Sequence, residues 1–434
     1  MAWKSWIKSI AAHPVKFNLV NTLAGPILRI VYVGLSLAAA LAVAAPARAQ
    51  AEPVIDSAPI PGYRFGEPLT FTLEAHSGAP ITRVSLYVRA SEDERTFMGL
   101  AQFVSGEQVT ATYSFDPRQR TLSAYTPVEY WWEVTDSSGA STRSEPASFV
   151  YVDNRFDWQS LETTDGRLAV HWYAGDAAFG QAALDATTSG YAGGRGLLAS
   201  AQLERADVYV YKSEADARAA LDSASPFWVS GYANPSGNSA IIVADPATPD
   251  ALSQVARDIP HELMHLLAAQ SNGGRLQGVP AWFNEGLAQL NEPAPDPDDA
   301  ALLANARAAG GLRALAEYCA PFPGDPDDAR LAYAHSAAVV RHIRNQFGVT
   351  KLSELLAAYA GGLSCEAGVQ EALGLTLAGL DQAWQAGPAV APGLLLNDTA
   401  GGWLVLALLV GVVAPLVLLL GLGGARPTQP ADGR

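Results

Sequence analysis

The chain is short of cysteine and, after its first fifty residues, of lysine. Its 434 residues include two cysteines, which excludes a zinc site built from four of them. After residue 49 only Lys212 and Lys351 remain, so arginine supplies nearly all of the positive charge. With a net charge of −15 the sequence offers no basic patch for a phosphate backbone. We therefore expect no nucleic-acid partner.

The two cysteines, Cys319 and Cys365, leave two interpretations open. Outside the cytoplasm they can form one structural disulfide, because oxidising compartments favour that bond. The alternative is a pair of free, buried thiols.

Charged residues are also scarce, and long apolar runs mark both ends of the chain. Charged residues make up 16% of the sequence and hydrophobic residues 49%. Residues 1–49 combine a basic start, a short apolar run and Ala-Arg-Ala, which predicts a signal peptide that is cut after Ala49. Residues 403–422 are uncharged and long enough to span a bilayer. We expect a single-pass membrane protein whose folded part lies outside the cytoplasm, with residues 391–402 as a linker and 423–434 as a cytoplasmic tail.

Residues 50–153 have the alternating pattern of a β-sandwich. Apolar and polar residues alternate in short runs such as Leu69–Leu73, Val84–Val88 and Tyr130–Val134, and turn residues separate these runs. The Tyr-Trp-Trp-Glu-Val run resembles a late strand of an immunoglobulin or fibronectin-type module, without the disulfide of antibody domains. Three roles stay open for this module, as a spacer, as a binding site for a protein partner or as a platform that presents substrate, and the residues do not select among them.

Residues 154–390 change to a mixed α+β pattern that ends in a helical lobe. Two apolar runs, 227–232 and 239–244, predict strands joined by an Asn-Pro-Ser-Gly turn. Residues 298–386 have mostly helical periodicity.

The most informative motif of the chain, H-E-x-x-H, lies in a run of helical periodicity. On a helix, His261 and His265 share one face, so that both imidazoles can bind the same Zn²⁺ ion. Glu262 lies close enough to take a proton from the attacking water without being a ligand. Proline cannot donate a helical hydrogen bond, so either the helix starts near Pro260 or a helix that begins after Pro249 is kinked there, and we favour a break at Pro260.

A third ligand is expected beside the two histidines, because catalytic zinc commonly takes two histidines and one carboxylate and leaves its fourth position to water. Glu285 follows His265 by twenty positions, within Val-Pro-Ala-Trp-Phe-Asn-Glu-Gly-Leu-Ala. A second helix there would place this carboxylate as the third ligand.

The motif HELMH followed by Asn-Glu-Gly resembles the gluzincin metallopeptidases, and the segment around Glu285 resembles their peptidase MA-like branch. The resemblance implies a zinc metallopeptidase that acts on peptides or proteins, and the run 403–422 would anchor it to the membrane. It also implies that the strand 240–243, the last before the zinc helix, is the sheet edge that pairs with substrate. The acidic G-x-M-E-N motif of aminopeptidases is missing, which favours an endopeptidase.

Further site residues follow from the same resemblance. Gluzincins use a downstream tyrosine or histidine to stabilise the oxyanion, and the segment Ala-Tyr-Ala-His-Ser makes Tyr333 the first candidate, with His335 more often structural. Gln289 is a candidate to orient a zinc-bound histidine, and Asn284 is a weaker one.

Two other functions remain open. The chain could be a surface binding or adhesion protein with a degenerate metal domain, although such a protein has no chemical reason to keep Glu262. It could also be a zinc amidase that acts on a non-peptide substrate, which only substrate profiling would separate from a peptidase.

Overall fold

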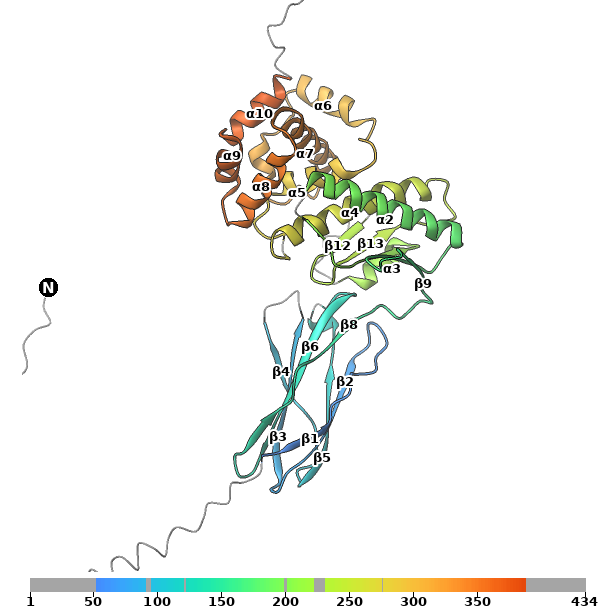
Figure 1. Cartoon of the computed structure of the whole chain (residues 1–434), viewed down its shortest axis with the longest axis vertical. Coiled ribbons are helices and arrows are strands. Elements are labelled where there is room, and N and C mark those ends of the chain that lie inside the picture. The colour runs from blue at the N-terminus through green and yellow to red at the C-terminus, as the bar shows by residue number, and fades with distance from the viewer. Residues whose placement is uncertain are drawn as a thin grey trace, which may run out of the picture.

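The computed structural model describes residues 52–90, 95–120, 122–198, 201–221, 231–274 and 276–387 (Figure 1). The predicted signal peptide and the predicted membrane helix at 403–422 lie outside these residues. Among the residues described, no helix is both long and apolar enough to cross a membrane.

Residues 54–151 form two antiparallel sheets, which we call the β-module. One sheet has the order β1-β2-β5, and the other has the order β4-β3-β6-β7, with β8 also paired to β6. The strands are β1 Val54–Ser57, β2 Leu69–His76, β3 Ile81–Ala90, β4 Phe97–Leu100, β5 Gln108–Phe115, β6 Thr126–Asp136, β7 Ser141–Arg143 and β8 Ala147–Tyr151, and a short 3₁₀ helix η1 spans Arg118–Arg120. The predicted strands of this region are confirmed.

Alternation of buried and exposed side chains explains why these strands form a two-layer structure. In β2, Leu69, Phe71 and Leu73 are buried while the residues between them face outward. Across β3 and β6, Leu86 pairs with Trp132, and both side chains are fully buried. The inner faces of the two sheets therefore share one hydrophobic core.

Residues 159–385, which we call the mixed domain, begin with a five-stranded sheet of order β12-β13-β11-β10-β9. Strands β10, β11 and β13 are parallel, and the outer strands β9 and β12 are antiparallel to their neighbours. The strands are β9 Gln159–Glu162, β10 Leu168–Trp172, β11 Ala206–Tyr211, β12 Gly231–Asn234 and β13 Ser239–Val243. The prediction that strand 240–243 is the sheet edge is wrong, because β13 lies between β12 and β11.

Two long helices, α2 Ala177–Leu197 and α4 Ala251–Ser271, cover one face of this sheet (Figure 1). Val208, Val210 and Ile242 point from the strands into the core that these helices share. The short helix α3 Glu214–Ala220 contacts β11 and β13. The mixed domain thus carries its histidine motif on a helix that is packed directly against the sheet.

Helix α4 begins at Ala251 and runs through Pro260, so the favoured break at this residue is wrong, and the helix starts just after Pro249 as in the alternative. Proline removes the donor for the carbonyl of Ala256, but Ala256 is exposed and water can replace that donor. Gly190 of α2 packs against the ring, where a Cβ would lie 2.7 Å from Pro260 Cα. Asn291 Nδ2 donates to the Pro260 carbonyl at 2.7 Å. Close helix crossing and this bond hold the proline inside the helix.

The rest of the mixed domain is helical, as predicted. Its elements are α5 Ala281–Asn291, α6 Asp299–Ala308, the 3₁₀ helix η2 Leu315–Cys319, α7 Pro326–Phe347, α8 Thr350–Ala360, α9 Cys365–Leu373 and α10 Leu377–Gln385. Side chains cap several of these helices, as at Asp325 before α7 and Thr376 before α10. A disulfide joins Cys319 to Cys365, so the first of the two interpretations of the cysteines is confirmed.

Candidate metal centre and active site

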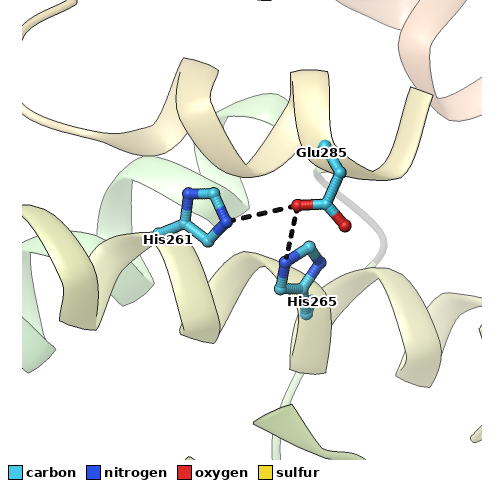
Figure 2. A group of neighbouring side chains, drawn as sticks. All are labelled: His261, His265 and Glu285. Atoms are coloured by element: carbon cyan, nitrogen blue, oxygen red, sulfur yellow. Dashed lines mark ion pairs between the residues drawn. The ribbon is translucent and has the colours of Figure 1, made fainter. Parts of the chain in front are cut away.

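The two histidines of α4 and one glutamate of α5 point toward one another (Figure 2). His261 Nε2 lies 3.4 Å from Glu285 Oε2, and His265 Nε2 lies 3.5 Å from the same oxygen. One ligand atom from each of the three residues lies within 4.8 Å of the others. The structure therefore brings together the three ligands predicted from the sequence.

The other ring nitrogen of each histidine is held by a hydrogen bond. His261 Nδ1 donates to Glu292 Oε1 at 2.8 Å, and His265 Nδ1 donates to Asn284 Oδ1 at 3.2 Å. Such bonds set the tautomer and the orientation of a metal-binding imidazole, and they leave both Nε2 atoms free to bind. Two nitrogens and one carboxylate oxygen in this arrangement fit a catalytic zinc ion.

Glu292 is a site residue that the sequence analysis missed. It follows Glu285 by seven positions, about two helical turns, and lies just past the last residue of α5, Asn291, on the side of the helix that carries Glu285. The spacing from Glu285 could have indicated Glu292 as a candidate. Only the packing of α5 across α4 shows that Glu292 contacts His261. The weaker candidate Asn284 does orient a histidine. Gln289 does not, since both Nδ1 atoms bind other residues, and it lines a cavity instead.

Glu262 lies beside the ligands and is almost fully buried, with an exposed fraction of 4%. A Cβ atom at Gly231 of β12 would lie 2.5 Å from Glu262 Oε1, so the bare backbone of β12 approaches this carboxylate. A side chain at position 231 would therefore displace the Glu262 carboxylate from its place beside the ligands.

Two cavities meet at this site. The first, which we call the edge-strand cavity, has a volume of about 520 Å³ and is lined by Gly231, Tyr232 and Ala233 of β12. The second, the acidic cavity, has a volume of about 310 Å³, and its lining includes Asp258, Glu292, Asp296, Asp299 and Arg330. His261, Glu262 and Tyr333 line both of them. Space for a bound chain thus extends to both sides of the site.

Tyr333 of α7 reaches the site as predicted, whereas His335 does not line either cavity. The Phe322 ring packs edge-on against the Tyr333 ring, with centroids 4.9 Å apart. His335 is fully buried, and its Nε2 lies 3.3 Å from Asp381 Oδ1 of α10. His335 is therefore a structural residue between two helices.

Burial and charge shift the protonation of these groups. Burial raises the pKa of the Tyr333 hydroxyl, and the charges of Glu285 and Glu262 raise it further, so Tyr333 remains a hydrogen-bond donor at neutral pH. Burial also raises the pKa of the Glu262 carboxyl, although both imidazoles oppose the shift. For Glu285 burial works in the same direction, but the charge of His265 and the bonds of both histidines outweigh it. They hold the pKa of Glu285 well below its ordinary value, which suits a ligand that binds as the anion.

Comparison with known families gives a match for the part of the chain that carries the candidate site. Residues 197–388 match the model of the Peptidase MA superfamily. This segment carries all three candidate ligands, and its match confirms the predicted resemblance to gluzincin metallopeptidases. The segment is a zinc metallopeptidase-like domain.

Comparisons with individual proteins give weaker similarities. No curated protein matches the chain. The M1 zinc metallopeptidase from Deinococcus radiodurans aligns over 74% of this chain and 90% of its own, with 13% identity and a TM-score of 0.32. The aminopeptidase N family protein from Idiomarina loihiensis aligns over 77% and 73%, with 9% identity and a TM-score of 0.33. For OgpA from Akkermansia muciniphila, in complex with an O-glycopeptide, the match covers 24% of this chain and 30% of that protein, with 8% identity and a TM-score of 0.19. The assignment rests on the family match.

Proposed function

We propose that the chain is a zinc metallopeptidase in which His261, His265 and Glu285 bind the metal and Glu262 is the general base. The observation that carries the proposal is the convergence of both Nε2 atoms on the Glu285 carboxylate, with Glu262 next to them in a cleft. When bound, zinc would polarise the scissile carbonyl and make water acidic enough to react near neutral pH.

The remaining steps belong to side chains of the protein. Glu262 takes a proton from the attacking water on its carboxylate and then donates it to the leaving amine. Tyr333 keeps its proton because burial raises its pKa, so its hydroxyl can donate to the oxyanion of the tetrahedral intermediate. The peptide is expected to lie along β12, because Gly231, Tyr232 and Ala233 line the cavity that contains the ligands.

We favour an endopeptidase, since cavities on both sides of Glu262 leave room for substrate in both directions. Strand β12 has the sequence Gly-Tyr-Ala-Asn and carries no acid to bind a substrate amine. The acidic cavity supports an aminopeptidase as a second candidate, because its carboxylates could bind an N-terminal amine. Cleavage of N-acetylated peptides as fast as free ones would select the endopeptidase, and loss of cleavage on acetylation would select the aminopeptidase.

We further propose that the enzyme acts outside the cytoplasm on a single membrane anchor at 403–422. The sequence of residues 1–49 and the Cys319–Cys365 disulfide support this location, since such bonds persist in oxidising compartments. The sheet orders of the β-module support an immunoglobulin- or fibronectin-like fold, and 50–153 and 154–390 remain the predicted domain bounds. Fractionation of cells and protease accessibility of the folded part would test the location.

The function itself is tested by metal analysis and peptide-library cleavage with the full-length protein and Glu262→Gln. We expect about one zinc per chain in both, and a rate at least about 100-fold lower in the variant, because the base is lost and the ligands are not. Glu371→Gln, at an exposed position of α9, is the matched control and should behave as wild type. An unchanged rate in Glu262→Gln contradicts the mechanism, zinc without any cleavage favours a binding protein, and cleavage only of non-peptide amides favours an amidase.

A further inference from the structure

The face of the mixed-domain sheet opposite α2 and α4 packs against the β-module. Tyr211 of β11 and Ile241 of β13 alternate with the residues that face the helices, and they belong to the same hydrophobic core as Tyr125 and Tyr151 of the module. Figure 1 shows the module at the lower end of the molecule, next to the sheet rather than the helical lobe. The two parts therefore meet through a shared core.

Tyr125 is the centre of this contact. Its backbone has φ 64°, a left-handed conformation that costs a bulky residue of order 1–3 kcal/mol and requires support from its surroundings. The ring stacks on Tyr209 of β11 with centroids 3.5 Å apart. Its hydroxyl lies 2.8 Å from the Tyr211 hydroxyl, which in turn donates to Asp153 at 2.8 Å. The fully buried Asp153 also forms an ion pair with Arg155.

The same segment of the module contacts the turn between β12 and β13. A Cβ atom at Gly237 would lie 2.1 Å from the Tyr125 carbonyl oxygen, so the turn lies directly on the module backbone. Asn234, the last residue of β12, donates from Nδ2 to Thr126 Oγ1 at 3.5 Å. One end of β12 is thus fixed by the β-module.

The other end of β12 lies at the active site. Gly231 meets the Glu262 carboxylate, and Tyr232 and Ala233 line the edge-strand cavity. The strand is four residues long, so its two ends are separated by only about 10 Å of extended backbone. A short strand paired along its length to β13 moves as a unit, and a shift at the turn therefore reaches Gly231.

We propose that the β-module positions the wall of the substrate cleft, with Tyr125 and Thr126 as positioning residues that act through the turn 235–238 and strand β12. The inference rests on the proposed function for its substrate, a peptide lying along β12. In this arrangement the module acts on peptide affinity. It does not touch the metal ligands, and it reaches the chemical step only through the contact of Gly231 with the Glu262 carboxylate.

Gly237→Ala is the variant that tests the contact. Gly237 does not have positive φ, so its backbone conformation suits alanine. The added methyl group collides with the carbonyl group of Tyr125 in the β-module and lies 3.3 Å from Ser239 Oγ. The matched control is Gly196→Ala in α2, where a Cβ meets no atom within 4 Å. Tyr125→Phe is a milder second variant that keeps the stacking and loses the hydroxyl contact with Tyr211.

The full-length variants are compared by hydrogen exchange of the Gly231–Asn234 amides, by zinc content, and by KM and kcat for a peptide that the wild type cleaves. For Gly237→Ala we expect faster exchange in β12, unchanged zinc, a KM higher by about fivefold to tenfold and a smaller fall in kcat, because Gly231 lies against the Glu262 carboxylate. Tyr125→Phe should also speed the exchange of β12 and raise KM, but by smaller factors than Gly237→Ala. Gly196→Ala should leave both the exchange and KM unchanged.

Unchanged exchange in β12 for both variants overturns the proposal, as does faster exchange with an unchanged KM. Should Gly237→Ala fail to fold, Tyr125→Phe decides by the same criteria. If the wild type cleaves no peptide, the proposed function fails, and the exchange of β12 alone then decides whether the module positions this strand.

Discussion

Replacement of Glu292 tests how the site holds its metal. Glu292 Oε1 accepts from His261 Nδ1 at 2.8 Å, and the carboxylate is 10% exposed, so water screens this bond little. Loss of a partner of this kind typically weakens metal binding by 10-fold to 100-fold, or about 1.4–2.7 kcal/mol. A hydrogen bond to a charged group is worth about 1.5–3 kcal/mol, so the two ways of counting agree.

We therefore expect Glu292→Ala to raise the zinc dissociation constant by about 10-fold to 100-fold. Glu292→Gln keeps an acceptor oxygen and loses the charge, so its effect should be about half as large in free energy. Zinc affinity is measured by competition with a chromophoric chelator at pH 7, with the exposed Glu371→Ala as control. Equal zinc affinity in Glu292→Ala and wild type would refute the view that this carboxylate orients His261.

Three further predictions concern the catalytic tyrosine, the disulfide and a buried aspartate. Tyr333→Phe should lower kcat by about 100-fold to 1,000-fold with KM nearly unchanged, because only the oxyanion contact is lost; an equal kcat in steady-state assays would reject that role. Replacing both Cys319 and Cys365 by serine opens a link of sequence separation 46 and should cost about 4 kcal/mol in denaturant unfolding, whereas no loss would show that the bond does not stabilise the fold. Burial works toward a higher pKa of Asp381, but the adjacent His335 imidazole and the hydrogen bond from the Leu315 amide outweigh it and hold the pKa below its ordinary value. The ionised form thus stabilises the fold above the unfolded-state pKa of about 3.9, and this contribution is lost as pH falls through the lower folded value. Asp381→Asn should accordingly lower Tm at pH 7 and lower it less near pH 3, and an equal loss at both would contradict the assignment.

The metal ligands could be predicted from the sequence because their geometry is local. His261 and His265 share a helix face by spacing alone, and Glu285 followed from a motif whose family has a known arrangement. The alternation of apolar and polar residues in strands such as Leu69–His76 likewise allowed the β-module to be predicted from the sequence.

Contacts between elements distant in the chain could not be predicted in this way. The local preference of proline predicts a helix break at Pro260. The close approach of Gly190 and the hydrogen bond from Asn291 override this preference. Glu292 meets His261 only because α5 crosses α4. Strand order placed β12 rather than β13 at the cleft, and nothing in the spacing indicated it. The tyrosines of β11 alternate as though one sheet face met another surface, but that pattern does not name the β-module as the partner.

The most direct test of the account is the position of the metal. A crystal of the full-length protein with zinc, measured at the zinc absorption edge, should give one anomalous peak about 2.0–2.2 Å from His261 Nε2, His265 Nε2 and a Glu285 carboxylate oxygen. No peak between these three residues, or a peak bound by other side chains, would contradict the central claim.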